Sequence, residues 1–305
     1  MQGPSTQGPP FPPPVPDLVA VGAALLAGHG IRVDPGSAQA VGGGCIHGAW
    51  RLAGAAGPVF LKTNNASAAW LLAAEADGLA GLREAGFLRV PGVLGHGVAG
   101  DTAWLALEWL ELHPATPASE HLLGEALARQ HLADGELFGW RQDNAIGATP
   151  QPNDMSDDWA VFFQARRIGF QLELGRRQGL PPQLLARGER LLAAIPALLA
   201  DRRPAPALLH GDLWSGNRAA DARGAPVVFD PAVHYGDPEC DLAMARLFGG
   251  FDRQFFAAYD ALIPPAPGRA RRERLYQLYH VLNHANLFGG GYAGQAERLI
   301  DSLLG

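Results

Sequence analysis

The sequence contains few of the residues on which several classes of protein depend. Its 305 residues include only two cysteines, Cys45 and Cys240, and no CxxC spacing, which argues against a disulfide framework or a cysteine zinc site. No uncharged apolar segment approaches the roughly 18 residues that span a bilayer, so we expect no membrane partner. The opening segment MQGPSTQGPPFPPPVPD lacks the basic and apolar blocks of a signal peptide, so we expect a cytoplasmic protein.

Basic residues are also scarce. The 24 Lys and Arg residues are outnumbered by 30 Asp and Glu residues, and the formal net charge is −6. A nucleic-acid-binding protein would show a basic surplus, so we expect no nucleic-acid partner. Hydrophobic residues make up 48% of the chain, and the chain is longer than a usual single core. We therefore expect a globular protein with two lobes.

The order of the apolar patterns predicts an α+β chain in three segments. Residues 1–16 are rich in Pro, Gly and Gln, and we expect a disordered or extended tail there. Residues 17–110 are predicted to form a sheet-rich lobe, and residues 111–305 a mainly helical lobe. The boundary between the two lobes is expected near residues 108–113.

Local patterns predict the elements within each lobe. A helix begins at Asp17, and short apolar runs separated by Gly and Pro then predict an antiparallel meander over residues 37–63. A helix over residues 66–86 and two more strands follow. From Pro117 onward helical spacing dominates, interrupted by two short elements at residues 205–217 and 225–241.

The stretch LLHGDLWSGN carries the strongest chemical signal. His210, Asp212 and Asn217 fit the H-x-D-x-x-x-x-N spacing of a kinase loop, which orients a hydroxyl and holds magnesium. Asp230 ends the apolar run VVFD, where a second metal-binding acid is expected. The alternative is a turn in which the Asp caps a helix and the Asn adopts a left-handed conformation.

Lys62 is the only lysine in the chain and lies on the third predicted strand, where kinases keep a phosphate-contacting lysine. On the next helix, Glu75 shares its face with Leu72 and Leu79. An acid on a buried face needs a cationic partner, and we expect Lys62 to supply it. The alternative is a surface lysine and an acid that reaches solvent.

Two further segments have the placement of nucleotide contacts. The turn VGGGCIHGAW falls between the first two strands, where the backbone of Gly42, Gly43 and Gly44 could approach phosphate oxygens, although such a turn is usually only a hairpin. The segment LALEWL ends the fifth strand. Its backbone at Glu108, Trp109 and Leu110 could hydrogen-bond adenine, as a kinase hinge does.

Together these segments resemble the fructosamine kinase family, also called ketosamine-3-kinases. The shared motifs include GGGCI, FLK, TPQPN, DDWAVFF, PALLHGDLWSGN, FDPAVHYGDPECDLAM and LYQLYHVLNHANLFGG, and they cover all but the first few dozen residues. The resemblance implies a bilobal protein-kinase-like fold with an antiparallel-sheet N-lobe that binds nucleotide. It also implies a mainly helical C-lobe that carries catalysis and substrate binding.

The resemblance implies ATP-dependent, magnesium-assisted phosphorylation of the sugar 3-hydroxyl in ketosamines, either free or on glycated proteins, which leads to deglycation. By the same resemblance Asp212 would be the base, and Asn217 and Asp230 the magnesium ligands. Lys62 would contact phosphate, with Glu75 as its partner. The runner-up is a kinase of the same fold acting on an aminoglycoside, choline or a free sugar. A binding module or pseudokinase would be expected to lack Lys62, Asp212 or Asp230.

Trp214 lies inside the proposed catalytic loop. We expect its indole to stack on the ketosamine, or alternatively to pack under the loop. Met155 and His47 depart from residues common in the family, Trp and Asn respectively. His280 and His284 have a metal-ligand spacing, but without a nearby acid we expect them to line the core or a pocket.

Cys45 follows the three glycines of the proposed phosphate loop. Backbone N–H dipoles and Lys62 would favour its thiolate, so we expect Cys45 to oxidise more readily than Cys240. We expect a monomer that can form a Cys45-linked dimer on oxidation. The alternative is a small apolar residue packed in a hairpin.

Overall fold

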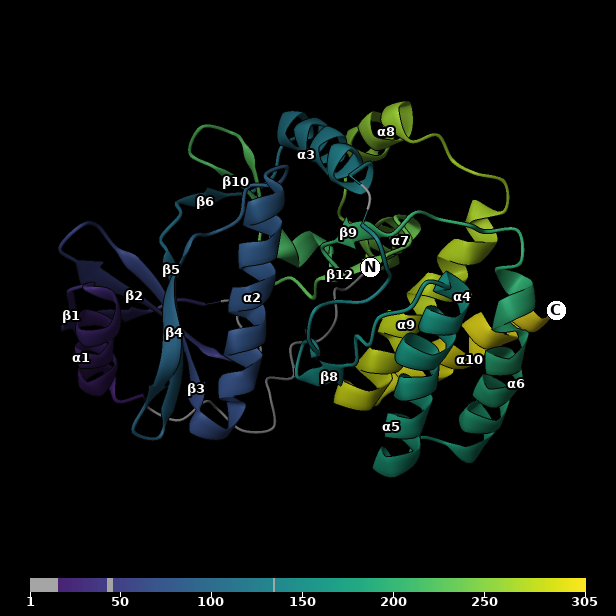
Figure 1. Ribbon diagram of the computed structural model, residues 1–305, viewed down its shortest axis with the longest axis horizontal. Helices are drawn as coiled ribbons and strands as arrows, with labels where there is room; N and C mark the ends of the chain where they lie inside the picture. Colours follow the sequence, from purple (N-terminus) through teal and green to yellow (C-terminus); the bar gives the residue numbers. More distant parts are fainter. Residues whose placement is uncertain (1–15, 43–45, 134) are drawn as a thin grey trace. The chain divides into compact units, whose positions relative to one another are not determined.

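The computed structural model describes residues 16–42, 46–133 and 135–305. The chain divides into two compact units, Met1–Ala80 with Pro91–Glu111 and Gly81–Val90 with Leu112–Gly305. Gly43, Gly44 and Cys45 lie outside the described residues. An antiparallel sheet in the first unit and helices in the second give the α+β fold that the sequence predicts (Figure 1).

The first unit is built on a five-stranded antiparallel sheet with the order β1-β2-β3-β5-β4. The expected meander is present, and β5 pairs with both β3 and β4. Six of the seven residues of β5 are buried, which fits the apolar sequence TAWLALE of a strand that has neighbours on both sides. The strands are β1 (Val33–Ala40), β2 (Gly48–Gly54), β3 (Val59–Asn65), β4 (Val93–Ala99) and β5 (Thr102–Glu108).

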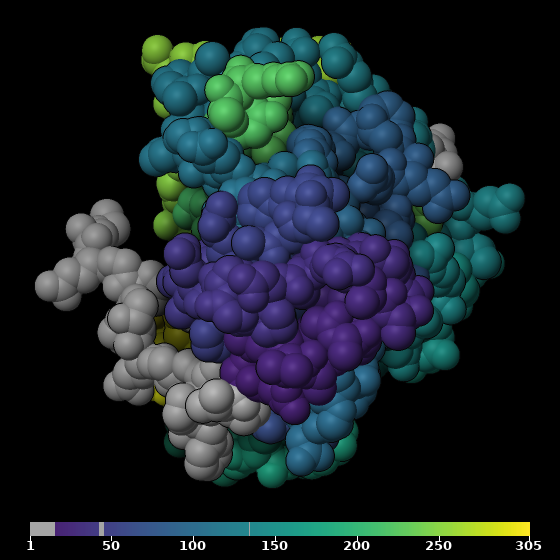
Figure 2. Space-filling view, turned by 90° about the vertical axis from the view of Figure 1, so that its left-hand side faces the viewer, coloured from purple at the N-terminus to yellow at the C-terminus, as the bar shows by residue number. Residues whose placement is uncertain are grey.

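Helix α1 (Leu18–His29) begins where the sequence predicts, because the Asp17 carboxylate accepts the amide of Ala20 at 2.9 Å. It contacts β1 and β4, and its Val21 and Leu25 join a small core with Leu61 of β3. Figure 2 shows this helix, in purple, on the surface of the unit. The helix predicted over residues 66–86 is α2 (Ala69–Ala85).

The second unit contains most of the helices. Helix α9 contacts α5, α7 and α10, and α6 contacts both α5 and α10, so that α5, α6, α9 and α10 lie side by side (Figure 1). Their facing side chains form the main core. The helices are α3 (Pro117–His131), α4 (Trp159–Phe162), α5 (Phe170–Gln178), α6 (Pro182–Leu198), α7 (Glu239–Leu247), α8 (Arg253–Leu262), α9 (Arg269–Phe288) and α10 (Gly291–Leu304).

Short strands connect these helices and place the loops of the site. One pair, β9 with β12, lies within the two short elements that the sequence predicts. In a second pair, β11 lies within the later element, whereas β10 begins at Arg218, just beyond the earlier one, and β6 extends this pair. The hairpin of β7 and β8 is an additional element, too short to show a strand pattern. The strands are β6 (Leu112–His113), β7 (Asn144–Ile146), β8 (Thr149–Gln151), β9 (Ala207–Leu209), β10 (Arg218–Asp221), β11 (Pro226–Val228) and β12 (His234–Gly236).

Within the region of predicted helical spacing, a π-helical stretch, Phe163–Gly169, lies between α4 and α5. This stretch carries Arg167, whose side chain is 1% exposed. The guanidinium donates to the Pro152 carbonyl at 2.7 Å and to the Asn153 side chain at 2.8 Å. Such local widening often accompanies a functional or special packing site. No helix in the described part of the chain is both long and apolar enough to cross a membrane.

Candidate active site

Within the first unit, Lys62 and Glu75 form the ion pair that the apolar face of α2 predicts. The Lys62 Nζ lies 2.7 Å from the Glu75 Oε1, and each side chain is only 10% exposed. Lys62 occupies the middle of β3, paired with Ala49 of β2 and Leu105 of β5. The sheet and the helix therefore fix the ammonium group, while its contact with phosphate stays a prediction.

The proposed hinge is tied to the preceding strand. Glu108 donates its amide to the Gly92 carbonyl at 2.8 Å, and its carboxylate accepts the Gly92 amide at 3.0 Å. The Trp109 ring lies near the Arg51 guanidinium, 5.2 Å from the ring centroid. Leu110 is half-buried. Adenine binding by this backbone stays a prediction.

At the described end of the glycine turn, Gly42 is exposed, and no atom of the described residues lies within 4 Å of a Cβ built there. His47, on the other side of the turn, has its Nδ1 2.9 Å from the Asn64 Nδ2, so this departure from the family pattern makes a contact with β3. Gly43 and Gly44, the other predicted phosphate contacts, lie outside the described residues.

In the second unit, the segment that follows β9 forms the Asp212 loop, residues 210–217. Gly211 has a φ of +82°, and a Cβ there would lie 2.0 Å from the Ala232 carbonyl oxygen. Only glycine fits this tight, left-handed position. By contrast, Gly216 is required for space, because a Cβ would overlap the Trp214 ring at 2.2 Å. Gly211 therefore allows the backbone to turn tightly, while Gly216 leaves room for the indole.

Asp241, on α7, anchors the start of the loop. Its two carboxylate oxygens accept the amides of His210 at 2.8 Å and Gly211 at 2.9 Å. His131 lies 3.2 Å from the same carboxylate and 2.9 Å from the Tyr259 hydroxyl. Burial alone would raise the pKa of Asp241, but the hydrogen bond and charge of His131 hold it below its ordinary value. Asp241 therefore serves as an ionised acceptor beneath the loop.

The sequence analysis assigned no role to Asp241, His131 or Tyr259. Asp241 does lie in the quoted motif GDPECDLAM, within a helix whose neighbouring side chains are buried. A buried acid needs partners, and this holds for Asp241 as it does for Glu75. That signal could have identified the residue, although it could not have identified the backbone amides that it binds.

Asp212, Asn217 and Asp230 lie together in the second unit. The Asn217 Nδ2 donates to the Asp212 carbonyl at 2.9 Å and to its carboxylate at 3.2 Å. It also lies 3.4 Å from the Asp230 carbonyl oxygen. Asp230 has a φ of 55°, and it is the only residue other than glycine with positive φ among those that the structure describes. Such backbone strain is frequent at functional sites.

The Asp212 carboxyl group has a perturbed pKa. Burial and the neighbouring Asp230 charge raise its pKa to about 7, while the hydrogen bond from Asn217 acts in the opposite direction. A carboxyl group whose pKa lies near neutrality can accept a proton at physiological pH.

His210 has a supporting part, as its position in the motif suggests. It is fully buried, and its Nε2 lies 3.1 Å from the Phe229 carbonyl, while its Nδ1 accepts the Asp212 amide at 3.3 Å. Burial lowers the pKa of His210, which is consistent with a neutral ring. The imidazole therefore shapes the loop through hydrogen bonds.

An aromatic row begins at Trp214. Its half-buried ring meets the edge of Phe248 at a centroid distance of 6.3 Å, and Phe248 packs on His284 at 5.1 Å. The His284 Nδ1 also donates to the His280 carbonyl, 2.7 Å away, so this nitrogen is occupied. No group of three His, Cys, Asp or Glu side chains in the described ranges could hold a metal. Met155, which departs from the residue common in the family, is 51% exposed.

The two cysteines differ in what the structure shows. Cys240 is buried near the start of α7, and burial raises the pKa of its thiol well above the ordinary value. It is therefore poorly placed for oxidation. Cys45 lies outside the described residues, so its proposed reactivity stays a prediction.

Residues 20–305 match the model of the fructosamine kinase family. A probable ketoamine kinase of Synechocystis is 44% identical over 87% of this chain and 90% of its own length. The chloroplastic protein-ribulosamine 3-kinase of Arabidopsis thaliana is 38% identical over 87% of this chain and 81% of its own length.

Solved structures agree with the family. A candidate fructosamine-3-kinase from Haemophilus somnus superposes with a TM-score of 0.84 at 29% identity, over 93% of this chain and 97% of that one. The aminoglycoside phosphotransferase APH(4)-Ia, in complex with ADP and hygromycin B, has a TM-score of 0.66 at 17% identity, over 93% of this chain and 98% of that one. The second likeness shows the kinase-like fold alone.

Proposed function

The chain belongs to the fructosamine kinase family, and we propose that it transfers phosphate from ATP to the 3-hydroxyl group of ketosamines. The observation that carries the proposal is the cluster of Asp212, Asn217 and Asp230, joined by the hydrogen bonds of the Asn217 amide. The relatives named as ketoamine and ribulosamine 3-kinases support this acceptor class.

Asp212 acts as the general base. Its raised pKa lets it take the proton of the sugar hydroxyl as the oxygen attacks phosphorus. The Asn217 amide orients the carboxylate, and Asp241 fixes the preceding backbone. The base is thus positioned by groups on both sides of the loop.

Asn217 and Asp230 are suited to hold Mg²⁺. Because the Asn217 Nδ2 is used by Asp212, its oxygen is left to face a metal, and Asp230 adds a carboxylate. Magnesium is usually bound by one or two protein oxygens together with water and phosphates, so this small donor set fits. When bound, the ion would neutralise charge on the transferring phosphate.

Lys62 supplies the nucleotide contact in the first unit. Its ion pair with Glu75 restricts the ammonium group to one orientation, which is what a phosphate contact needs. The hinge at residues 108–110 and the turn that contains Gly42 complete the proposed ATP contacts. The presence of Lys62, Asp212 and Asp230 together favours an enzyme over a binding module that lacks activity.

Trp214 contacts the ketosamine. The indole is half-buried and has an aromatic neighbour in Phe248, so it offers a fixed apolar face to a sugar ring or chain. We propose ribulosamines or fructosamines, free or on protein lysines, as acceptors. The 3-phosphorylated sugar can enolise towards C1 and lose phosphate from C3, after which hydrolysis frees the amine, so the outcome is deglycation.

A screen of ATP consumption with ribulose-lysine, fructose-lysine and kanamycin tests the proposal. We expect turnover of a ketosamine, and a fall in kcat of about 10²- to 10⁴-fold in the Asp212→Asn variant, the usual range for loss of a general base. Asp221→Asn, an exposed Asp on the adjoining strand β10, is the matched control. Strong turnover of kanamycin alone would favour the runner-up function, and a near-normal kcat in Asp212→Asn would remove Asp212 from its role.

A further inference from the structure

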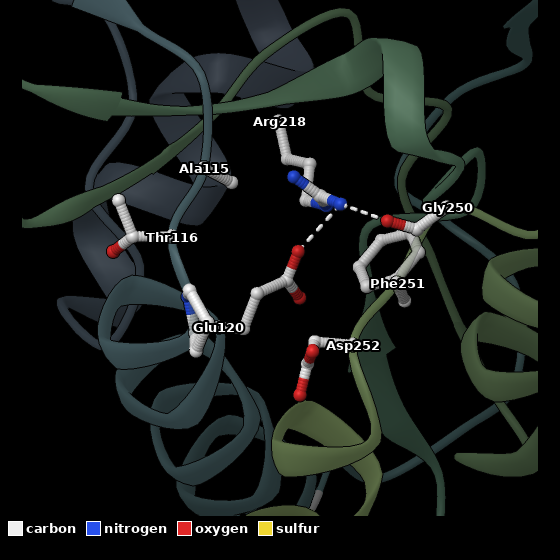
Figure 3. A pocket seen from close by; sticks show the side chains of 8 residues that line it. Ala115, Thr116, Glu120, Arg218, Gly250, Phe251 and Asp252 are labelled. Carbon is white, nitrogen blue, oxygen red and sulfur yellow. Dashed lines mark hydrogen bonds and ion pairs between the residues drawn. The ribbon is translucent and has the colours of Figure 1, made fainter.

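A cavity of about 300 Å³ lies within the second unit, apart from the Asp212 cluster. It is lined by Ala115, Thr116, Pro117, Glu120, Arg218, Gly250, Phe251 and Asp252 (Figure 3). Asp212, Asn217 and Asp230 are not among these residues. The volume lies at the lower end of the range for small-molecule pockets, and it exceeds the space of a single water several-fold.

Glu120 and Arg218 form an ion pair that leaves hydrogen-bonding capacity unused. The Arg218 Nη2 lies 2.5 Å from the Glu120 Oε1 and also donates to the Gly250 carbonyl. The Glu120 side chain is 3% exposed, and the Arg218 side chain is 9% exposed. The Glu120 Oε2 and the Arg218 Nε are buried, and no hydrogen-bond partner for either lies in the described part of the chain. Leaving a buried donor or acceptor unpaired is costly.

The pKa of Glu120 is raised, chiefly by burial. Burial raises the pKa, the nearby charge of Asp252 raises it further, and Arg218 and the Asp252 backbone act in the opposite direction. Figure 3 shows the carboxylate pointing between Arg218 and Asp252, towards the centre of the lining residues. The group is therefore positioned to meet a donor that enters the cavity.

The charge balance favours a neutral occupant. Two carboxylates and one guanidinium line the cavity, for a side-chain charge of −1. The first turns of α3 and α8 lie at the same place, since Thr116 and Asp252 are their N-caps. Each helix N-terminus carries about half a positive charge, so the total is close to zero. Neither an ammonium ion nor a phosphate gains a clear advantage from such a lining.

Phe251 adds an apolar surface. Its ring lies 4.5 Å from the Arg218 guanidinium carbon, which holds the arginine side chain in place. An unpaired acceptor, an unpaired donor and an aromatic side chain around one cavity suit a molecule with several hydroxyl groups. One hydroxyl can donate to the Glu120 Oε2 while another accepts from the Arg218 Nε.

We propose that this cavity binds a small neutral polyhydroxylated molecule, a polyol or free monosaccharide, through Glu120 and Arg218. This is a second site, beside the proposed catalytic one. It is close to the catalytic loop in the chain, because Arg218 follows Asn217, and a Cβ on Gly250 would lie 2.7 Å from Ser215. An occupant would therefore stabilise the backbone that carries the proposed metal ligand.

Xylitol tests the proposal, because it carries neither the carbonyl nor the amine of a ketosamine. Titration calorimetry on the full chain should show saturable binding. Glu120→Gln keeps the size of the side chain but replaces one acceptor by a donor, so we expect the affinity to fall about tenfold or more. Arg218→Lys keeps the charge and removes Nε, and it should weaken binding similarly. Crystals soaked with xylitol would locate the molecule directly.

Two controls separate this site from others. Glu125→Gln, on the same helix but paired with Arg129 at the surface, should bind xylitol like the parent. Trp214→Ala should also bind normally, which excludes the proposed acceptor site. The proposal is overturned if xylitol does not bind saturably, if both Glu120→Gln and Arg218→Lys bind like the parent while remaining folded, or if ethylammonium or inorganic phosphate binds instead. None of these results would affect the kinase proposal, which the ketosamine assay tests separately.

Discussion

Replacement of Asp241 by asparagine changes a single buried atom beneath the Asp212 loop. Each Asp241 oxygen accepts one backbone amide, that of His210 at 2.8 Å or that of Gly211 at 2.9 Å. Asparagine keeps one carbonyl oxygen, but its NH₂ group cannot accept a hydrogen bond. One of the two amides would therefore lose its acceptor and face another donor.

The expected loss of stability follows from the one amide that is left without an acceptor. A hydrogen bond to a charged group contributes about 1.5 to 3 kcal/mol, and an unsatisfied buried donor costs roughly 1 to 3 kcal/mol. We therefore expect the free energy of unfolding to fall by about 3 to 5 kcal/mol, a large part of the roughly 5 to 15 kcal/mol typical of a folded protein. We also expect kcat to fall, because the Gly211 amide fixes the backbone next to Asp212.

Urea denaturation of the parent and Asp241→Asn measures the change, and a ketosamine assay measures kcat. The chain offers a matched control in Asp221, whose Oδ1 accepts the amides of Arg223 and Ala225, both at 2.9 Å, at an exposed turn. In Asp221→Asn the carbonyl oxygen of the new side chain can take the place of Oδ1 and keep both hydrogen bonds, so this variant should lose much less stability. Equal losses in the two variants would refute the anchoring role of Asp241.

Asp230→Ala is expected to weaken nucleotide-dependent magnesium binding, with partial recovery of activity in excess magnesium; unchanged magnesium dependence would count against Asp230 as a ligand. The parent is expected to lose activity to peroxide and regain it with dithiothreitol, whereas Cys45→Ala should be active and insensitive. A non-reducing gel reports the disulfide, and equal inactivation of both proteins would return Cys45 to a packing role. Asp212→Asn is expected to raise the free energy of unfolding at about pH 8 relative to the parent, as urea denaturation can measure.

Several parts of the fold could be predicted because their cause is local. The meander of the first unit follows from short apolar runs between glycines, and the start of α1 follows from the Asp17 cap. The pairing of Lys62 with Glu75 follows from one acid on an apolar helical face and one lysine on the adjoining strand. In each case neighbours in sequence determine which groups are buried together.

Other features depend on contacts between distant segments. Asp241 binds amides about thirty residues away, and no local pattern indicates that α7 packs beneath the Asp212 loop. Aspartate is one of the few residue types that tolerate a positive φ, but the sequence does not indicate that Asp230 in particular adopts one. The cavity at Glu120 and Arg218 likewise joins residues almost a hundred positions apart. Sequence spacing predicted which residues lie in the Asp212 loop, but not what holds the loop in place.

The stability of Asp212→Asn connects the chemistry of the site to the fold. In the unfolded chain an aspartate ionises near a pKa of about 3.9, whereas burial and Asp230 raise the pKa of Asp212 to about 7 in the folded protein. Between these values the folded state keeps a proton that the unfolded chain has lost, so the contribution of Asp212 to stability falls as pH rises, and the loss is complete above about pH 7. Three pKa units correspond to roughly 4 kcal/mol as an upper limit.

An asparagine side chain cannot ionise, so the variant avoids this penalty. Its stability relative to the parent should be lowest near pH 4 and should rise until about pH 8, where an ionised Asp212 would face Asp230 at close range. Contacts of the new amide with Asn217 act equally at every pH, so the pH dependence of the difference isolates the charge. A difference that stays constant across this range would show that Asp212 ionises as an ordinary carboxylate. The base would then lack the raised pKa on which proton transfer near neutrality depends.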